Sequence, residues 1–170
     1  VSADCGAENA ESRVVLVPPW FAAAALFVAL DADLDVVVAI KEGVPTQDVS
    51  RVSRVLDETD THLVGPNGPG VITPGEIKAG ILPGNVFEPG PVGLVSWSGT
   101  LTYQILDSLT ARGFGQSTAV GIGGDPIVGT RLADAPRLSH TDPDTDAVGP
   151  SGHSGGEDAE QARTSVPDTD

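Results

Sequence analysis

The sequence predicts an α/β protein with parallel sheets, arranged as two units of which the first is incomplete. Short apolar runs alternate with stretches of helical spacing from Arg13 onward, and the run "DVVVAI" at 35–40 continues without a polar interruption. A Gly- and Pro-rich passage at 65–91 divides the alternation into two parts. Alternating strands and helices are typical of a parallel sheet with crossover helices, and an uninterrupted apolar strand is typical of a sheet covered on both faces.

The first unit is predicted to contain three strands and two helices. The apolar run "RVVLV" stops at two prolines, and an Ala- and Leu-rich helix follows. In the second helix Val49, Val52 and Leu56 share one face at helical spacing, and Thr46 is placed to cap it. The expected elements are a strand at 13–17, a helix at 20–32, a strand at 35–40, a helix at 46–60 and a strand at 62–65.

The second unit begins after the passage at 65–91, which we interpret as the connection between the units because it has too few regularly spaced apolar residues for a helix. A strand is expected at 92–96, a helix at 99–113 and a strand at 117–124. Gly113 suits the end of the helix, since glycine adopts the left-handed conformation without a steric cost.

Beyond Leu138 the chain is rich in Asp, Gly, Ser and Pro and has almost no large apolar residues. Such a segment cannot bury enough surface to offset its ordering entropy, so we expect disorder or loose structure there. The predicted organisation is therefore an incomplete first domain at 1–75, a partial second domain at 76–138 and an acidic low-complexity tail at 139–170.

Composition excludes several classes of function. The chain has 9 Lys and Arg against 24 Asp and Glu, a formal net charge of −15, which argues against nucleic acid or an anionic membrane surface as a partner. An acidic surface is typical of proteins from a high-salt cytoplasm, and we take that habitat as a hypothesis. The sequence shows no signal peptide and no apolar run of the roughly 18 residues that a membrane span needs, so we predict a cytoplasmic protein. The lone Cys5 excludes an internal disulfide, and no Cys/His cluster has metal-ligand spacing.

Four loops follow predicted strands, where open α/β sheets bind ligands: "VPPWF", "IKEGVP", "VSWSGT" and "GIGGDP". In the third, a helix beginning near Gly99 leaves backbone N–H groups free for an anion, and Ser98 and Thr100 add hydroxyl donors. The alternative is that Ser98 only caps the helix. Glu42 and Glu76 are candidate catalytic carboxylates, or solvated residues of turns.

A serine hydrolase is a weaker interpretation of the same serines. The nucleophile elbow requires G-x-S-x-G, and neither register around Ser96 and Ser98 fits it. The three histidines, His62, His140 and His153, lie in a predicted strand or in the tail, where nothing identifies one of them as a base.

Four longer stretches, read together, resemble one family. They are "VPPWFAAAALFVALDADLDVVVAIKEGVP", "GPNGPGVITPGE", "GLVSWSGTLTYQ" and "GFGQSTAVGIGGDPIVGT". From Val14 to Asp134, in unbroken order, the chain resembles the alpha subunits of succinyl-CoA synthetase, also called succinate–CoA ligase. The resemblance implies a Rossmann-like unit followed by a flavodoxin-like unit, in a subunit truncated at both ends.

The resemblance also implies a ligase of the tricarboxylic acid cycle. The family joins succinate and coenzyme A through a phosphohistidine, and a beta subunit carries Mg²⁺ and the nucleoside triphosphate in a heterodimer or heterotetramer. The matching positions are Val17, Pro18, Ile40, Lys41 and Glu42 for coenzyme A, Ser98, Gly99 and Thr100 for phosphate, and Tyr103 for substrate.

Departures from the family pattern matter as much as the matches. Lys41 replaces a small or polar residue, Gly68 replaces a cysteine, and Trp97 replaces an arginine beside the proposed anion site. "GHSGG" around His153 resembles the context of the catalytic histidine; in a second register His153 replaces a glutamate, the catalytic histidine lies beyond Asp170, and "AVGPSG" has lost an expected strand. A noncatalytic acyl-CoA- or anion-binding module is the alternative function.

Overall fold

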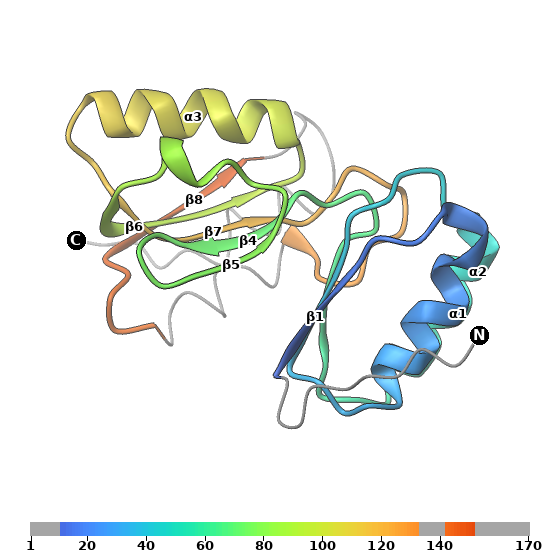
Figure 1. Cartoon of the computed structure of the whole chain (residues 1–170). Helices are drawn as coiled ribbons and strands as arrows, with labels where there is room; N and C mark the ends of the chain where they lie inside the picture. Colours follow the sequence, from blue (N-terminus) through green and yellow to red (C-terminus); the bar gives the residue numbers. More distant parts are fainter. Residues whose placement is uncertain (1–10, 133–141, 152–170) are drawn as a thin grey trace.

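The computed structural model describes residues 11–132 and 142–151 (Figure 1). The described residues form two sheets that lie side by side, one with three strands and one with five. This arrangement confirms the predicted α/β class with parallel sheets. Among the residues described, no helix is both long and apolar enough to cross a bilayer.

The first sheet is wholly parallel and has the order β1-β2-β3. Its helices α1 and α2 both lie on the same side of the sheet (Figure 1). A core of aliphatic side chains fills the space between them, and Leu26, Val37 and Val52 are fully buried there. The elements are β1 (Ser12–Val15), α1 (Pro19–Leu30), β2 (Val36–Ala39), α2 (Thr46–Leu56) and β3 (His62–Val64).

The second sheet is mixed and has the order β5-β4-β7-β6-β8. Strands β6, β7 and β8 run parallel, whereas β4 is antiparallel to both of its neighbours. Helix α3 covers one face (Figure 1), and Leu106 from this helix packs with Leu94 and Ala119 of the sheet. The elements are β4 (Gly70–Thr73), β5 (Ile77–Gly80), the 3-10 helix η1 (Gly84–Val86), β6 (Pro89–Ser96), α3 (Gly99–Ala111), β7 (Gln116–Gly121) and β8 (Ala147–Ser151).

The passage at 65–91, predicted to be a plain connection, in fact contains β4, β5 and η1. Each strand has four residues, too few for periodicity to reveal, and the strands pair through backbone groups from Gly70↔Gly80 to Thr73↔Ile77. The change of sheet therefore falls at Gly70, a few residues before the predicted boundary at 75 and 76. The domain boundaries stay a prediction.

The prediction of disorder from residue 139 onward is wrong for 147–151, and the strand thought to be lost is present. Strand β8 pairs with β6 from Val92↔Ala147 to Ser96↔Ser151. An edge strand gains its stability from backbone hydrogen bonds on one side, so it needs few large apolar side chains. A turn at 142–145 leads into it, in which Asp142 accepts hydrogen bonds from the Thr145 hydroxyl and the Asp144 amide.

The helix ends test two further predictions. Thr46 is the first residue of α2 rather than its cap; Pro45 occupies the cap position, and no side chain caps this helix. The expectation for Gly113 is confirmed, because it has φ +81° one residue beyond the Arg112 cap of α3, and the Phe114 amide donates to the Leu109 carbonyl at 2.9 Å.

Candidate functional site

The carboxyl ends of the two sheets meet around the loop that follows β3. The Gly68 amide donates to the carbonyl of Ala39 at the end of β2 (3.4 Å), and the Asn67 amide donates to the carbonyl of Lys41 (3.2 Å). The Asn67 side chain donates through Nδ2 to Oδ1 of Asp125, at 2.9 Å, in the loop after β7. One asparagine therefore connects "IKEGVP" to "GIGGDP", two of the four loops that the sequence singled out.

Backbone packing holds the same loops together. A Cβ built on Gly123 would lie 2.1 Å from the Pro66 carbonyl oxygen, and the residue has φ +93°. Only glycine fits at residue 123, because any side chain would push the loops after β3 and β7 apart. Beyond the loop after β7 the chain returns to the first sheet, where the Thr130 amide and hydroxyl both donate to the carbonyl of Leu63.

The two loops of the first sheet predicted to contact coenzyme A also adjoin each other. Val17 packs against a cluster that includes Val44 of the second loop and Val49 of α2, and Ile127 of the loop after β7 packs against the same cluster. A small cavity of about 140 Å³ lies beside this cluster. Pro18, Lys41 and Glu42 are exposed, whereas Val17 and Ile40 are partly buried. The structure thus brings the five predicted residues to one edge of the sheet and leaves the charged ones accessible.

The corner between β6 and α3 is a capped helix N-terminus. Ser98 Oγ accepts from the Leu101 amide at 3.4 Å, and the Ser98 carbonyl accepts from the Thr102 amide at 3.0 Å and the Thr102 hydroxyl at 2.6 Å. The Gly99 and Thr100 amides have no carbonyl partner within the helix, because the first amides of any helix lack one. Ser98 therefore acts as the cap, and the amides of the next two residues remain available to an anion.

This corner lies beside the other loops. A Cβ on Gly99 would be 3.8 Å from the Pro69 side chain, and one on Gly124 would be 3.8 Å from the Trp97 carbonyl oxygen. Trp97 packs with a cluster formed by Val95, Ile122 and Leu132. The Trp97 side chain is thus a packed part of the corner.

The other predicted residues are distributed more widely. Tyr103 is partly buried and packs against the second-sheet core of Ile72 and Leu106. Glu76 lies in the turn between β4 and β5. The Thr73 hydroxyl, which precedes this turn, is hydrogen-bonded to the Thr118 hydroxyl near the start of β7. The turn is therefore at the amino end of β7, whereas the corner follows the carboxyl end of the parallel strand β6. Glu42 alone of the two candidate carboxylates adjoins the site. His153 and His140 lie outside the described residues.

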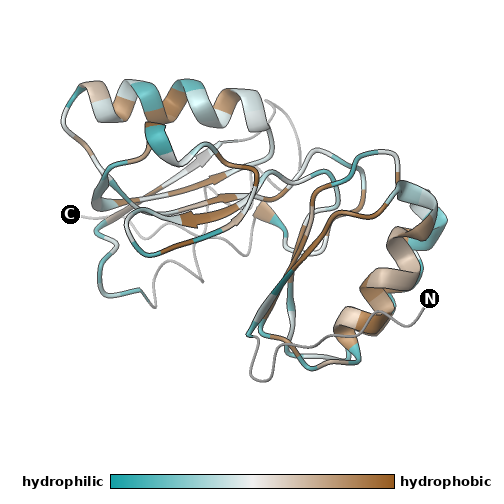
Figure 2. Ribbon diagram, viewed as in Figure 1, coloured by the Kyte–Doolittle hydropathy of each residue, from teal (hydrophilic) through white to brown (hydrophobic). Residues whose placement is uncertain are grey.

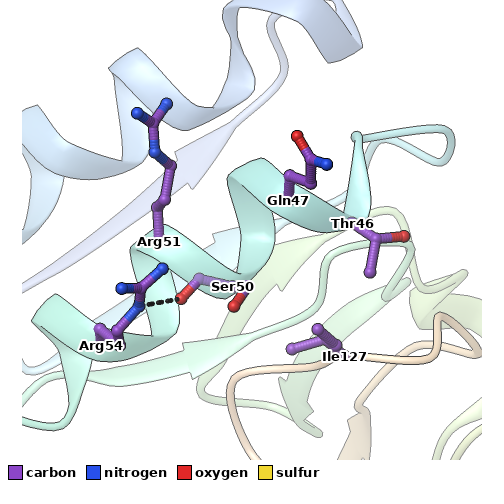
Figure 3. Close-up of a pocket in the computed structure, with 6 residues that line it drawn as sticks. All are labelled: Thr46, Gln47, Ser50, Arg51, Arg54 and Ile127. Atoms are coloured by element: carbon purple, nitrogen blue, oxygen red, sulfur yellow. Dashed lines mark hydrogen bonds between the residues drawn. The ribbon is translucent and has the colours of Figure 1, made fainter.

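A groove that the sequence analysis missed runs along α2 (Figure 3). It has a volume of about 550 Å³ and shares Thr46 and Ile127 with the small cavity. Arg51 and Arg54 both line it; Arg51 lies 3.8 Å from Asp48, and Arg54 donates through Nε to the Ser50 carbonyl at 3.3 Å. The spacing of three residues between Arg51 and Arg54 could have indicated this groove from the sequence, since it places two cations on one side of a helix.

Comparison with known proteins identifies the relatives of this arrangement. A family model described as CoA-ligase matches residues 95–170. A succinate–CoA ligase (ADP-forming) alpha subunit from Aquifex aeolicus is 48% identical over 156 residues, which cover 91% of this chain and 51% of the relative. Over nine-tenths of its length, this chain is a homologue of succinate–CoA ligase alpha subunits. The family predicted from the four sequence stretches is confirmed.

A second relative and a solved structure agree with this placement. The corresponding subunit from Staphylococcus epidermidis is 50% identical over 154 residues, again 91% of this chain and 51% of the relative. An ATP citrate lyase from Methanothrix soehngenii, solved with citrate and coenzyme A, superposes with a TM-score of 0.79 at 27% identity, over 89% of this chain and 26% of that one. The chain thus spans about half the length of the succinate–CoA ligase subunits that it matches.

Proposed function

We propose that this chain supplies part of the alpha subunit of a cytoplasmic succinate–CoA ligase, which forms succinyl-CoA in the tricarboxylic acid cycle. The observation that carries the proposal is the identity of about half of the aligned residues with succinate–CoA ligase alpha subunits along nine-tenths of the chain. The convergence of the predicted loops at the carboxyl ends of two adjoining sheets supports it, because ligands bind at that edge in α/β proteins.

Coenzyme A is proposed to bind at the loops of the first sheet. Val17 and Ile40 provide apolar contacts, while Lys41 offers an exposed cation for a phosphate group. The residues present fit this role, because a coenzyme A thioester presents both an apolar arm and a charged nucleotide. When bound, coenzyme A supplies the thiol that accepts the succinyl group.

The corner at Ser98 to Thr100 is proposed to hold the phosphoryl group. The Gly99 and Thr100 amides point out of the first turn of a helix of 13 residues, whose dipole favours negative charge at this end. The nucleoside triphosphate and Mg²⁺ are assigned to a beta subunit, as is the completion of the active site. Tyr103 is proposed as a substrate contact, and the histidine that carries phosphate is His153 or a residue outside this chain.

Phosphoryl transfer provides the test. The chain is incubated with a succinate–CoA ligase beta subunit, Mg²⁺ and labelled nucleoside triphosphate, and acid-labile, base-stable label is sought. Label on this chain that is lost in His153→Asn assigns the phosphoryl acceptor to His153. Label that survives this substitution contradicts that assignment.

A pair of substitutions in α3 tests whether the corner at Ser98 to Thr100 holds the phosphoryl group. Thr100→Pro would remove one of the two amides at a first-turn position that tolerates proline, whereas Ser108→Ala alters an exposed residue far along α3. We expect the first change alone to reduce labelling or phosphate binding. Coenzyme A binding without any labelling would favour the alternative, a noncatalytic acyl-CoA-binding module.

A further inference from the structure

The loop after β3 contains the only Asn-Gly dipeptide in the sequence. The chain has three asparagines, at 9, 67 and 85, and of these Asn67 alone is followed by glycine. The side-chain amide of an asparagine is attacked by the backbone nitrogen of the next residue, and glycine has no side chain to hinder that attack. Asn67 is therefore the asparagine whose local sequence most favours deamidation.

Deamidation at this dipeptide consumes only water. The Gly68 nitrogen gives its proton to a base and bonds to the side-chain carbon Cγ of Asn67. The Cγ–Nδ2 bond then breaks, Nδ2 takes up a proton from water, and ammonia leaves a five-membered succinimide. Water adds to one of the two ring carbonyl carbons, the ring C–N bond breaks and the ring nitrogen regains a proton. The product is aspartate or isoaspartate, and nothing is oxidised or reduced.

Hydrogen bonds hold both reacting groups of this dipeptide. The Gly68 amide donates to the carbonyl of Ala39 at 3.4 Å, and Nδ2 of Asn67 donates to Oδ1 of Asp125 at 2.9 Å. The Gly68 amide cannot lose its proton while it donates to Ala39, and Cγ of Asn67 cannot reach the Gly68 nitrogen without strain on the bond to Asp125. Deamidation therefore requires that the junction of these loops opens first.

Close packing has the same effect on the Asn67–Gly68 peptide. Gly68 is buried and Asn67 is partly buried. A Cβ built on Gly68 would lie 2.6 Å from the carbonyl oxygen of Gly121, so the backbone has no room to move toward β7. A buried and hydrogen-bonded amide meets base from the solvent only when the local structure opens. The rate of deamidation should thus report how often the junction opens.

The product would place a second carboxylate against Asp125. An ionised carboxylate only accepts hydrogen bonds, so two acceptors of like charge would replace the present bond and repel each other. Residues 65–70 are all Gly, Pro or Asn, and Figure 2 shows pale or hydrophilic colouring over much of the loops between the two sheets. This loop has no large apolar side chain to keep it in place once its bond to Asp125 is lost.

We propose that Asn67-Gly68 is a deamidation site controlled by the junction between the two sheets. The closed junction suppresses the reaction, and the aspartate or isoaspartate formed in the open junction disfavours closing again. Each opening that leads to reaction is thereby made permanent. The loop that contains Lys41, whose carbonyl accepts from the Asn67 amide, loses part of its support at the same time. These contacts lie within the chain, so the control does not depend on ligase activity.

Deamidation rates in the folded and unfolded chain test the control. The full chain is incubated at mildly alkaline pH with or without guanidinium chloride, and a short tryptic digestion yields peptide 55–78 with Asn67 and peptide 79–112 with Asn85. Mass spectrometry measures the conversion of each amide to an acid. In denaturant Asn67 is expected to react faster than Asn85. Without denaturant its reaction is expected to be slower by at least about tenfold, because local opening limits it.

Two matched variants separate the junction from overall stability. Asp125→Ala removes the carboxylate that holds the Asn67 side chain, whereas Thr73→Val removes another side-chain hydrogen bond of 2.9 Å, to Thr118 near the start of β7. Circular dichroism checks that both variants fold. Without denaturant, Asn67 is expected to react about fivefold faster in Asp125→Ala, the change in an opening equilibrium that one hydrogen bond produces. The rate in Thr73→Val is expected to be unchanged.

A second set of variants tests the effect of the product. Asn67→Asp reproduces the aspartate form and keeps the left-handed backbone at this position, φ +59°, which aspartate also tolerates. The urea midpoint is expected to fall in Asn67→Asp and to recover in Asn67→Asp/Asp125→Asn, because the amide then lies on the other side of the same contact. Asp125→Asn alone provides the reference for the change at 125.

Four outcomes would overturn the proposal. They are a reaction at Asn67 no faster than at Asn85 in denaturant, equal rates at Asn67 with and without denaturant, equal rates in Asp125→Ala and Thr73→Val, and no recovery of the midpoint in the double variant. All four are measured as peptide masses or unfolding midpoints. Histidine labelling enters none of them, so failure here is distinguishable from failure of the proposed function.

Discussion

Replacing Gly123 by alanine should loosen the junction between the two sheets. The residue has φ +93°, and an alanine Cβ there would lie 2.1 Å from the Pro66 carbonyl oxygen. Holding a residue with a side chain in left-handed conformation costs about 1–2 kcal/mol. A normal carbon–oxygen contact is about 3.3 Å or more, so the loops must also separate by over about 1 Å, an overpacking that costs about 1–3 kcal/mol more. The expected loss in the free energy of unfolding is thus about 2–5 kcal/mol.

Gly113 supplies the matched control, because it has φ +81° but no atom within 4 Å of the added methyl group. Gly113→Ala should therefore cost only the conformational part, about 1–2 kcal/mol. Urea unfolding followed by circular dichroism, with equal slopes in all three proteins, gives the comparison. Equal losses in the two variants would mean that the close contact between the loops is absent, and the convergent site would lose its main support.

Three smaller predictions concern single hydrogen bonds. A double-mutant cycle of Asn67→Ala and Asp125→Ala in urea unfolding should give a coupling of about 1 kcal/mol, and additive effects would contradict the bond. Ser98→Ala should lower the free energy of unfolding by about 1 kcal/mol and Ser98→Gly by a few tenths, since the cap is a single long contact. Hydrogen bonds from the Thr145 hydroxyl and, secondly, from the Asp144 amide hold the pKa of Asp142 below its usual range. The Asp142 carboxylate therefore contributes to stability above its unfolded-state pKa, and this contribution is lost as the pH falls through the folded-state pKa. Carboxyl carbon NMR should show this low midpoint rising toward the ordinary range of an aspartate in Thr145→Val.

The sequence was sufficient for those elements whose periodicity extends over several residues. Helix α3 was predicted at 99–113 and spans Gly99–Ala111, and its glycine terminator lies where the prediction put it. Strands β1, β2 and β3 were each placed to within two residues at either end. In these segments the local apolar pattern and the tertiary packing favour the same conformation, so local analysis gives the right result.

The missed elements depend on partners that are distant in the sequence. Strand β8 is specified by its hydrogen bonds to β6, more than fifty residues earlier, rather than by its own side chains. Strands β4 and β5 pair through glycines at one end, and a pattern of four residues cannot distinguish them from a loop. The bond between Asn67 and Asp125 has the same origin, because nothing near either residue in the sequence indicates the other.

The corner at Ser98 shows how the sequence and structural arguments combine. The sequence alone left two interpretations, a simple cap and an anion site, and the hydrogen bonds show that the first does not exclude the second. Ser98 uses its hydroxyl and carbonyl within the helix, while the Gly99 and Thr100 amides face out of it. Trp97, which the resemblance predicts to stand in place of an arginine, packs with Val95 and Ile122 and so contributes packing rather than charge. At this corner the groups that can hold an anion are therefore the two backbone amides, the Thr100 hydroxyl and the helix dipole. Its affinity should depend on the geometry of the helix end more than on a single cationic side chain.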